Sequence, residues 1–231
     1  GEHGAGGAMT LRSALVGANG TITQRTELDT RVCDCCQTSA AMTSNGPVVV
    51  YRDRRDEEVR DISIVRAING TWTQPMTIGE DNWKIAGCPV NGPSVDAIDT
   101  SLAVAWFTAS TGVGDVKIAF SKDAGATFTA PFNVSTGSAT GRVDVVLLDK
   151  DNNEAALIWM QPNGDEEFIY LLKVNEKGSI GNPITISRTS QERASGFPQL
   201  EKVGDQLYIA WTEVGENATT IKTAQVALTK L

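Results

Sequence analysis

A short apolar strand that carries an aromatic side chain recurs four times along the chain. The four copies are Val48-Val49-Val50-Tyr51, Ala103-Val104-Ala105-Trp106, Ala156-Leu157-Ile158-Trp159 and Tyr208-Ile209-Ala210-Trp211. The aromatic residues of successive copies are 55, 53 and 52 positions apart. A period of about 50 residues is typical of folds that stack one supersecondary unit several times.

Further strands surround each copy. A polar loop and an alternating strand follow it, as in Ile62-Ser63-Ile64-Val65. A tight turn such as Asn69-Gly70 then leads to an outer strand that begins with proline, as at Pro75. Asn-Gly suits a two-residue hairpin because such turns need positive φ, and proline suits an outer strand because that edge needs no N–H donor. With the apolar segment before each copy, the repeat predicts four antiparallel strands, which is a propeller blade.

We therefore predict an all-β chain, a β-propeller of four-stranded antiparallel blades, with about four blades of a six-bladed ring. A β-sandwich with coincidental spacing is the alternative. Residues 9–231 form the propeller, and residues 1–8 are interpreted as a tag scar or a disordered Gly-rich start.

The propeller is expected to be incomplete at its N-terminus. Residues 9–16 and 22–27 have the pattern of only the third and fourth strands of a blade, whereas residues 196–228 supply a first, second and third strand. An incomplete ring exposes an apolar blade face, so we expect self-association through that face.

Charge and composition exclude several classes of function. The chain has 20 Lys and Arg against 28 Asp and Glu, a net charge of −8, so a nucleic acid partner is not expected. No apolar run is long enough for a membrane span. The single histidine, His3, lies in the excluded start, which rules out Ser-His-Asp chemistry in the folded part and argues against a catalytic zinc site. We predict no cofactor.

The segment Ser121-Lys122-Asp123-Ala124-Gly125-Ala126-Thr127-Phe128 resembles the Asp-box, or BNR repeat, of the sialidase (neuraminidase) propellers. The resemblance implies a structural turn between the third and fourth strands of a blade, on the face opposite the active site. Its structural residues here are Ser121, Asp123, Gly125, Thr127 and Phe128. Sialidases use an arginine triad, an acidic Asp and a Tyr–Glu pair, and this sequence offers no convincing nucleophile, so the resemblance leaves catalysis open.

Ligands of propellers bind at the ring axis, between the loops that lead into the innermost strands and those that join the second and third strands. The densest charge cluster, residues 51–61, falls in one of the latter loops. Asp53 and Asp61 are candidate general acids, and arginine forks suit a sugar carboxylate. The alternative is a solvated loop whose charges pair with one another. The candidate substrate-binding residues are Arg31, Arg52, Arg54, Arg60, Arg142, Arg193, Trp83 and Asn91.

The cysteines Cys33, Cys35, Cys36 and Cys88 precede the innermost strands of adjacent blades, so we expect them to lie close together. They lack the two Cys-x-x-Cys pairs of many zinc sites. Two interpretations stay open: disulfides, with one joining Cys88 to the other three, or a thiolate site for a soft metal such as copper.

Together these features predict a secreted or periplasmic sialidase-like propeller that binds an acidic or polar glycan at its axis. Whether it also hydrolyses the glycan, as an exo-sialidase-like glycoside hydrolase would, is left open. The alternative is a non-catalytic propeller that binds a protein, or a soft metal through its cysteines.

Overall fold

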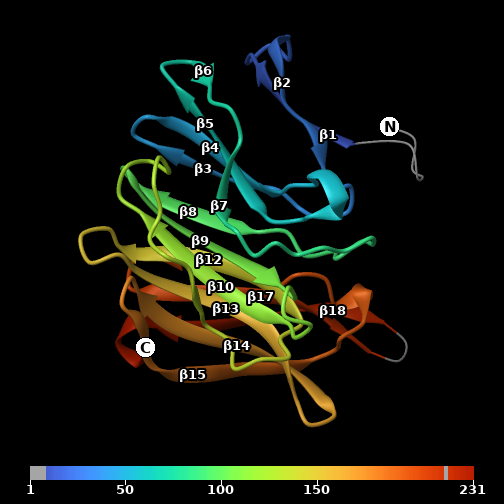
Figure 1. Cartoon of the computed structure of the whole chain (residues 1–231). Helices are drawn as coiled ribbons and strands as arrows, with labels where there is room; N and C mark the ends of the chain where they lie inside the picture. Colours follow the sequence, from blue (N-terminus) through green and yellow to red (C-terminus); the bar gives the residue numbers. More distant parts are fainter. Residues whose placement is uncertain (1–8, 216–217) are drawn as a thin grey trace.

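The computed structural model describes residues 9–215 and 218–231, and the predicted start at residues 1–8 lies outside the described residues. Five antiparallel sheets follow one another in chain order and stack face to face (Figure 1). The first has two strands and the second has five. Their bounds are β1 (Met9–Val16) and β2 (Ile22–Val32), then β3 (Ser39–Thr43), β4 (Gly46–Arg52), β5 (Ile62–Ile68), β6 (Thr71–Trp72) and β7 (Met76–Gly79).

The third and fourth sheets have four strands each, and the fifth has three. Their bounds are β8 (Ser94–Ile98), β9 (Ser101–Thr108), β10 (Asp115–Ser121) and β11 (Phe132–Asn133), then β12 (Gly141–Asp149), β13 (Glu154–Asn163), β14 (Glu166–Asn175) and β15 (Gly178–Thr189), and finally β16 (Gln199–Val203), β17 (Gln206–Val214) and β18 (Thr219–Ala227). Three short 3₁₀ helices complete the described part: η1 (Asp56–Glu58), η2 (Arg193–Ser195) and η3 (Leu228–Lys230).

The predicted blades are confirmed. In all but the second sheet, the strands pair only with their neighbours in sequence. The second sheet departs from the prediction, because two outer segments, β6 and β7, both pair with β5. The predicted turn before β6 has Asn69 and Gly70 at φ values of 51° and 79°, as a two-residue hairpin needs.

Alternation of side chains along the second strand of each blade places apolar groups on both faces of the sheet. In β9, Ala103 and Ala105 join the core shared with the fourth sheet, whereas Leu102, Val104 and Trp106 join the core shared with the second sheet. All eight residues of β9 are buried. A strand buried on both faces has an uninterrupted apolar sequence, which explains the apolar runs of the repeat.

The repeated aromatic residue always faces the preceding sheet. Tyr51 packs with Leu28 and Val32 of β2, and Trp106 belongs to the core between the second and third sheets. Trp159 and Trp211 occupy the equivalent cores before the fourth and fifth sheets. One bulky side chain per blade at this position fills the space between twisted sheets, which accounts for the period seen in the sequence.

The Asp-box segment forms the turn that follows β10. The Asp123 carboxylate accepts hydrogen bonds from the Thr127 backbone N–H (2.9 Å), the Thr127 hydroxyl (2.6 Å) and the Ser121 hydroxyl (2.8 Å). Gly125 has a φ of 79°, a backbone conformation that strains any other residue, and a Cβ there would approach Ile64 Cδ1 to 2.7 Å. Phe128 packs against the core between the second and third sheets.

The loops at the start of β10 and those at its end lie on opposite faces of the stack. The Asp-box turn follows the end of β10, and its Ala124 N–H donates to Thr100 of the β8–β9 turn. The other face carries the β4–β5 loop with η1, the loop before β8, and η2 (Figure 1). We call this second face the loop face. Among the described residues, none of the helices has the length and apolarity that crossing a membrane requires.

Candidate functional site

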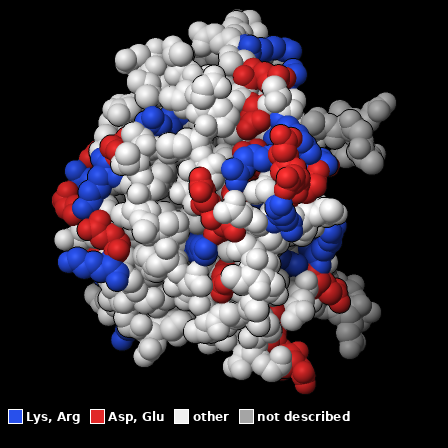
Figure 2. Space-filling model, in the orientation of Figure 1, with Lys and Arg blue, Asp and Glu red and all other residues white. Residues whose placement is uncertain are grey.

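Charged side chains gather on the loop face around η1, on the right-hand side of Figure 2. They belong to the end of β2, to the β4–β5 loop and to the loop that follows β7. A cavity opens among them, which we call the Asp53 cavity. Its lining residues are Asp29, Arg31, Asp53, Arg54, Arg55, Asp56, Glu57, Val59, Asn82 and Lys84.

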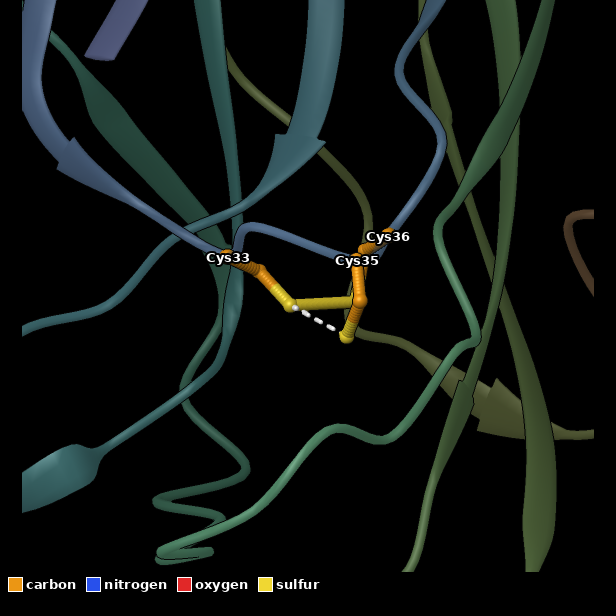
Figure 3. Close-up of side chains that lie close together, drawn as sticks. All are labelled: Cys33, Cys35 and Cys36. Atoms are coloured by element: carbon orange, nitrogen blue, oxygen red, sulfur yellow. Dashed lines mark hydrogen bonds between the residues drawn. A yellow bond between two sulfur atoms is a disulfide. The ribbon is translucent and has the colours of Figure 1, made fainter. Parts of the chain in front are cut away.

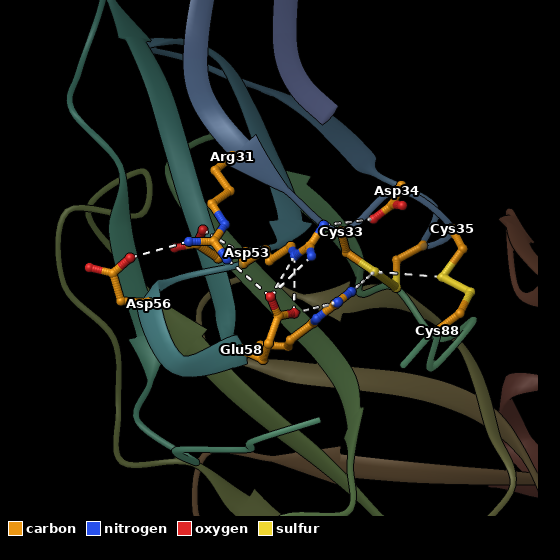
Figure 4. A network of polar contacts seen from close by, with 11 residues as sticks. Arg31, Cys33, Asp34, Cys35, Asp53, Asp56, Glu58 and Cys88 are labelled. Atoms are coloured by element: carbon orange, nitrogen blue, oxygen red, sulfur yellow. Dashed lines mark hydrogen bonds and ion pairs between the residues drawn. A yellow bond between two sulfur atoms is a disulfide. The ribbon is translucent and has the colours of Figure 1, made fainter. Parts of the chain in front are cut away.

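Three predicted arginines converge on one carboxylate, that of Glu58. Arg54 donates to it through Nε (3.0 Å) and Nη2 (3.0 Å), and Arg60 donates through Nη2 (2.7 Å). Arg31 donates through Nη2 (3.0 Å), and Figure 4 shows Arg31 beside Glu58. The bonds from Arg54 and Arg60 lower the pKa of Glu58 to about 2. The structure therefore brings Arg31, Arg54 and Arg60 together, but around a carboxylate of this chain.

Asp53 lies at the end of β4 and faces the cavity beside Arg31 (Figure 4). The carboxyl group is 8% exposed and accepts hydrogen bonds from the Arg54 N–H (2.6 Å) and the Ser63 hydroxyl (3.1 Å). Burial raises the pKa of Asp53, the Arg54 N–H opposes the rise, and the nearby Asp29 carboxylate adds to it. A cavity-facing carboxyl group with a raised pKa can hold and transfer a proton.

Asp61, the other candidate acid, has no exposed surface on its side chain. Its two oxygens accept the Trp83 N–H (3.1 Å), the Asn82 N–H (3.1 Å) and Arg55 Nη2 (2.5 Å). These bonds fix the loop that follows β7 against the β4–β5 loop. Asp61 is thus placed behind the cavity wall rather than in it, and a structural role explains its position.

Arg52 is also placed away from any ligand. Its side chain is buried and donates to the backbone carbonyls of Asn91 (2.7 Å), Arg60 (2.5 Å) and Phe107 (2.5 Å). The guanidinium lies 4.9 Å from the ring centroid of Trp83. Arg52 therefore holds loops of the second and third sheets together instead of contacting a glycan.

Trp83 and Asn91 have similar structural positions. Trp83 is 7% exposed, and its ring meets that of Phe107 edge-on at 5.6 Å, so it anchors its loop and offers no face to a sugar. Asn91 is 8% exposed, donates to the Thr140 carbonyl (3.1 Å) and accepts the Arg142 N–H (2.7 Å). Both residues were predicted as substrate contacts, and neither lines the Asp53 cavity.

Arg142 and Arg193 lie together, apart from the Asp53 cavity. The Arg142 side chain is 8% exposed and fixes the η2 segment through Ser195 Oγ (2.5 Å), the Gly196 carbonyl (2.9 Å) and the Gln191 carbonyl (2.9 Å). Arg193 is exposed within η2, and its charge acts on Arg142. The predicted arginines therefore form two groups and do not share one centre.

The four cysteines lie together where the chain leaves β2 and where the loop before β8 passes. Two disulfides connect them, Cys33–Cys36 and Cys35–Cys88, and the Sγ atoms of Cys33 and Cys35 are 3.7 Å apart (Figure 3). The predicted link from Cys88 to the other cysteines is present, as Cys35–Cys88. This bond joins residues 53 positions apart and ties the loop before β8 to the end of β2.

Some charged residues of the loop face could not be identified as site residues from the sequence. Asp29 accepts the Tyr51 hydroxyl (2.5 Å), and Lys84 pairs with Glu57 at the cavity rim. Neither Asp29 nor Lys84 belongs to a charge cluster or a recognisable motif in the sequence. Asp29 precedes Arg31 by two residues in an extended strand, and that alternation alone could have placed both on one side of β2.

A second cavity lies between the fourth and fifth sheets, beside Glu167. Glu167 is 3% exposed, and neither carboxylate oxygen has a hydrogen bond of normal geometry. Burial raises its pKa, partly offset by the nearby Thr140 and Gln191 side chains. Carboxylates dominate the lining, and its arginine, Arg188, is paired with Glu166 at 2.7 Å, so this cavity suits an acidic ligand poorly.

The sequence matches no protein-family model and no curated protein. Solved structures are similar in fold. The phage phi92 endosialidase has a TM-score of 0.63 at 12% identity, over 91% of this chain and 39% of that one. A xylan beta-1,4-xylosidase from Bacillus halodurans has a TM-score of 0.51 at 13% identity, over 82% and 39%. A lectin from Aleuria aurantia, in complex with alpha-methyl-L-fucoside, has a TM-score of 0.51 at 11% identity, over 95% and 74%.

The chain thus spans about two fifths of the length of the endosialidase and of the xylosidase. At identities this low the likeness concerns the fold, and it does not single out the sialidases. The order of the sheets and the cores between successive sheets are those of a propeller, and these solved structures have the same fold. The chain has the β-propeller fold.

Proposed function

We propose that the loop face binds an acidic or polar glycan in the Asp53 cavity, and that Asp53 donates the proton if the bound glycan is hydrolysed. The observation that carries the proposal is the position of Asp53. It is a buried carboxyl group with a raised pKa, and it faces a cavity whose walls also present Arg31, Arg54 and Arg55. Cleavage of a glycosidic bond uses a general acid together with a nucleophile or an activated water. Asp53 would supply the acid, and guanidinium groups would hold the carboxylate of the sugar.

A glycan carboxylate has an accessible partner in Arg31. The Arg31–Asp56 ion pair (3.2 Å) involves an Asp56 side chain that is fully exposed, and exposed pairs contribute little free energy. An incoming carboxylate can replace Asp56 and accept a charge-assisted hydrogen bond from Arg31 Nη1, while Nη2 stays bound to Glu58. Lys84 and Arg55 also line the cavity, and each is paired with a carboxylate of this chain, Glu57 and Asp61 respectively.

The fold and the disulfides support the same proposal. Solved structures with this fold include an endosialidase, a xylosidase and a fucoside-bound lectin, which favours a carbohydrate ligand. Two disulfides are typical of proteins in oxidising compartments, which supports the secreted or periplasmic location. The Asp-box turn favours a sialidase-like ligand, because the resemblance it carries is to that family.

The test combines a panel of fluorogenic glycosides, including a sialoside, with calorimetric binding of the corresponding free glycans. Asp53→Asn should abolish hydrolysis and leave binding within a few-fold of wild type. Arg31→Met should weaken binding of carboxylated glycans by about 10-fold, the loss expected for one charge-assisted contact of about 1.4 kcal/mol.

Arg25→Met is the matched control, because Arg25 is exposed in β2 and lies outside the cavity lining. It should change neither binding nor hydrolysis. If Arg31→Met weakens glycan binding but wild type hydrolyses no glycoside, the protein binds glycans without catalysis. No binding across the panel, or equal effects of Arg31→Met and Arg25→Met, would overturn the proposal.

A further inference from the structure

The two disulfides lie next to each other, so their sulfur atoms form one cluster. Four Sγ atoms from two segments meet there, three from the turn after β2 and one from the loop before β8 (Figures 3 and 4). The Sγ atoms of Cys33, Cys35 and Cys36 all lie within 4.8 Å of one another. Cys88 Sγ is bonded to Cys35 and so belongs to the same cluster.

The spacing of these atoms suits a tetrahedral centre. Thiolate ligands about 2.3 Å from a central cation lie about 3.8 Å from each other. The Sγ atoms of Cys33 and Cys35, which are not bonded to each other, are already 3.7 Å apart. Reduction of the two disulfides therefore leaves four sulfurs in one cluster, with one pair already at the spacing of such a centre.

The surroundings favour thiolates over thiols. Arg60 Nη1 lies 3.4 Å from Cys33 Sγ, and both side chains are buried. A guanidinium beside a sulfur stabilises its negative charge, and a donor N–H to a coordinating sulfur is the kind of outer contact that fixes metal ligands.

We infer that the reduced cluster binds one thiophilic d¹⁰ cation, Cu(I) or Zn(II), through Cys33, Cys35, Cys36 and Cys88. Soft thiolate donors select such cations, and the described residues contain no histidine that could join them. Each disulfide takes two electrons and two protons from a dithiol reductant, which leaves as its own disulfide. The four thiols then release up to four protons when the cation binds. This site is independent of the glycan proposal.

The test starts from the whole chain, reduced without oxygen by a phosphine that is then removed. Zn(II), or Cu(I) held in a competing chelator, is added in separate arms, and bound metal and free thiols are counted. One cation per chain, with all four cysteines protected from alkylation, is the expected result. A thiolate-to-metal charge-transfer band should appear with Cu(I), and Co(II) in the Zn(II) arm should give tetrahedral visible bands.

The double variant Cys35→Ser/Cys88→Ser retains the Cys33–Cys36 pair and should lose more affinity than the 10–100-fold that an outer contact is worth. The unreduced protein should bind no metal. Reduced protein that keeps its circular dichroism spectrum but binds no cation overturns the inference. If reduction itself alters the circular dichroism spectrum, binding of the cation should restore it. A spectrum that the cation does not restore would also overturn the inference.

Discussion

Arg52 donates to backbone carbonyls in three segments that are far apart in sequence: the β4–β5 loop, the loop before β8 and the end of β9. Its guanidinium is buried, so substitution of Arg52 would remove a charged donor from each of these carbonyls, and water could not take its place. At the scale of single residues, the stability of the loop face thus depends on Arg52. Its charge alone had suggested that Arg52 binds the ligand.

Replacing Arg52 by Met should lower the free energy of unfolding by about 3 kcal/mol, because three buried acceptors lose their partner. Urea unfolding followed by tryptophan fluorescence measures this loss. Arg25→Met, at an exposed position, should change stability by less than about 0.5 kcal/mol. Equal effects of the two substitutions would show that the carbonyls find other donors.

Glu167 should make stability depend on pH. Because burial raises its pKa in the folded state, the wild-type protein loses stability as pH rises from about 4.3, the value of an unperturbed Glu, through the folded value. Glu167→Gln carries no charge and should escape this loss. The variant should match wild type near pH 4 and become more stable toward neutral pH. Urea unfolding at several pH values measures this effect. A difference in unfolding free energy between wild type and Glu167→Gln that does not change with pH would contradict this expectation.

At the scale of elements, the Asp-box turn shows how one residue closes a blade. The Asp123 carboxylate bonds to both ends of its own turn, and the Ala124 N–H reaches the β8–β9 turn of the same sheet. The turn lies on the face opposite the Asp53 cavity. Its contribution is therefore to stability and not to ligand contact.

Asp123→Ala should lower the free energy of unfolding by about 1–2 kcal/mol, since three partly exposed hydrogen bonds are lost. Chemical denaturation measures this change, and Asp123→Asn, which retains one carbonyl acceptor, should lose less. Glycan binding should be unchanged in both variants. A binding defect as large as that of Arg31→Met would place the turn near the ligand and contradict the assignment of faces.

The elements were predictable from sequence because their signals are local. Alternation, the turn at Asn69-Gly70 and the repeated aromatic residues depend on near neighbours, and each has its place in the structure. The roles of Arg52, Asn91 and Trp83 were not predictable, because they depend on carbonyls and rings that other loops bring close. The outer strand at Pro75 was predicted and is β7, whereas the additional pairing of β6 with β5 had no sequence signal.

At the scale of the whole molecule, apolar side chains remain uncovered on the first and last sheets. Val16 and Ile22 of the first sheet are 63% and 49% exposed, and Ile221 of the last sheet is 70% exposed. In the sheets between them, strands such as β9 are buried along their whole length. Self-association through such a face therefore stays a prediction.

Sedimentation velocity over a concentration series tests that prediction. The sedimentation coefficient of wild type should rise with concentration, whereas Val16→Lys/Ile221→Lys should sediment as a monomer because lysine disfavours apolar contact. Val113→Lys is the matched control, since Val113 is 46% exposed in the β9–β10 loop and away from both end sheets. A wild-type coefficient independent of concentration would contradict the prediction.

The separate cores between successive sheets also determine how the molecule comes apart. Each sheet is held only by its neighbours, so opening can start at either end while the middle persists, as in other modular arrays. Amide hydrogens of β9 and β13, whose strands are covered on both sides, should exchange with deuterium last. Those of β1 and β18 should exchange first, and the order of exchange would trace the sequence of opening from the ends inward.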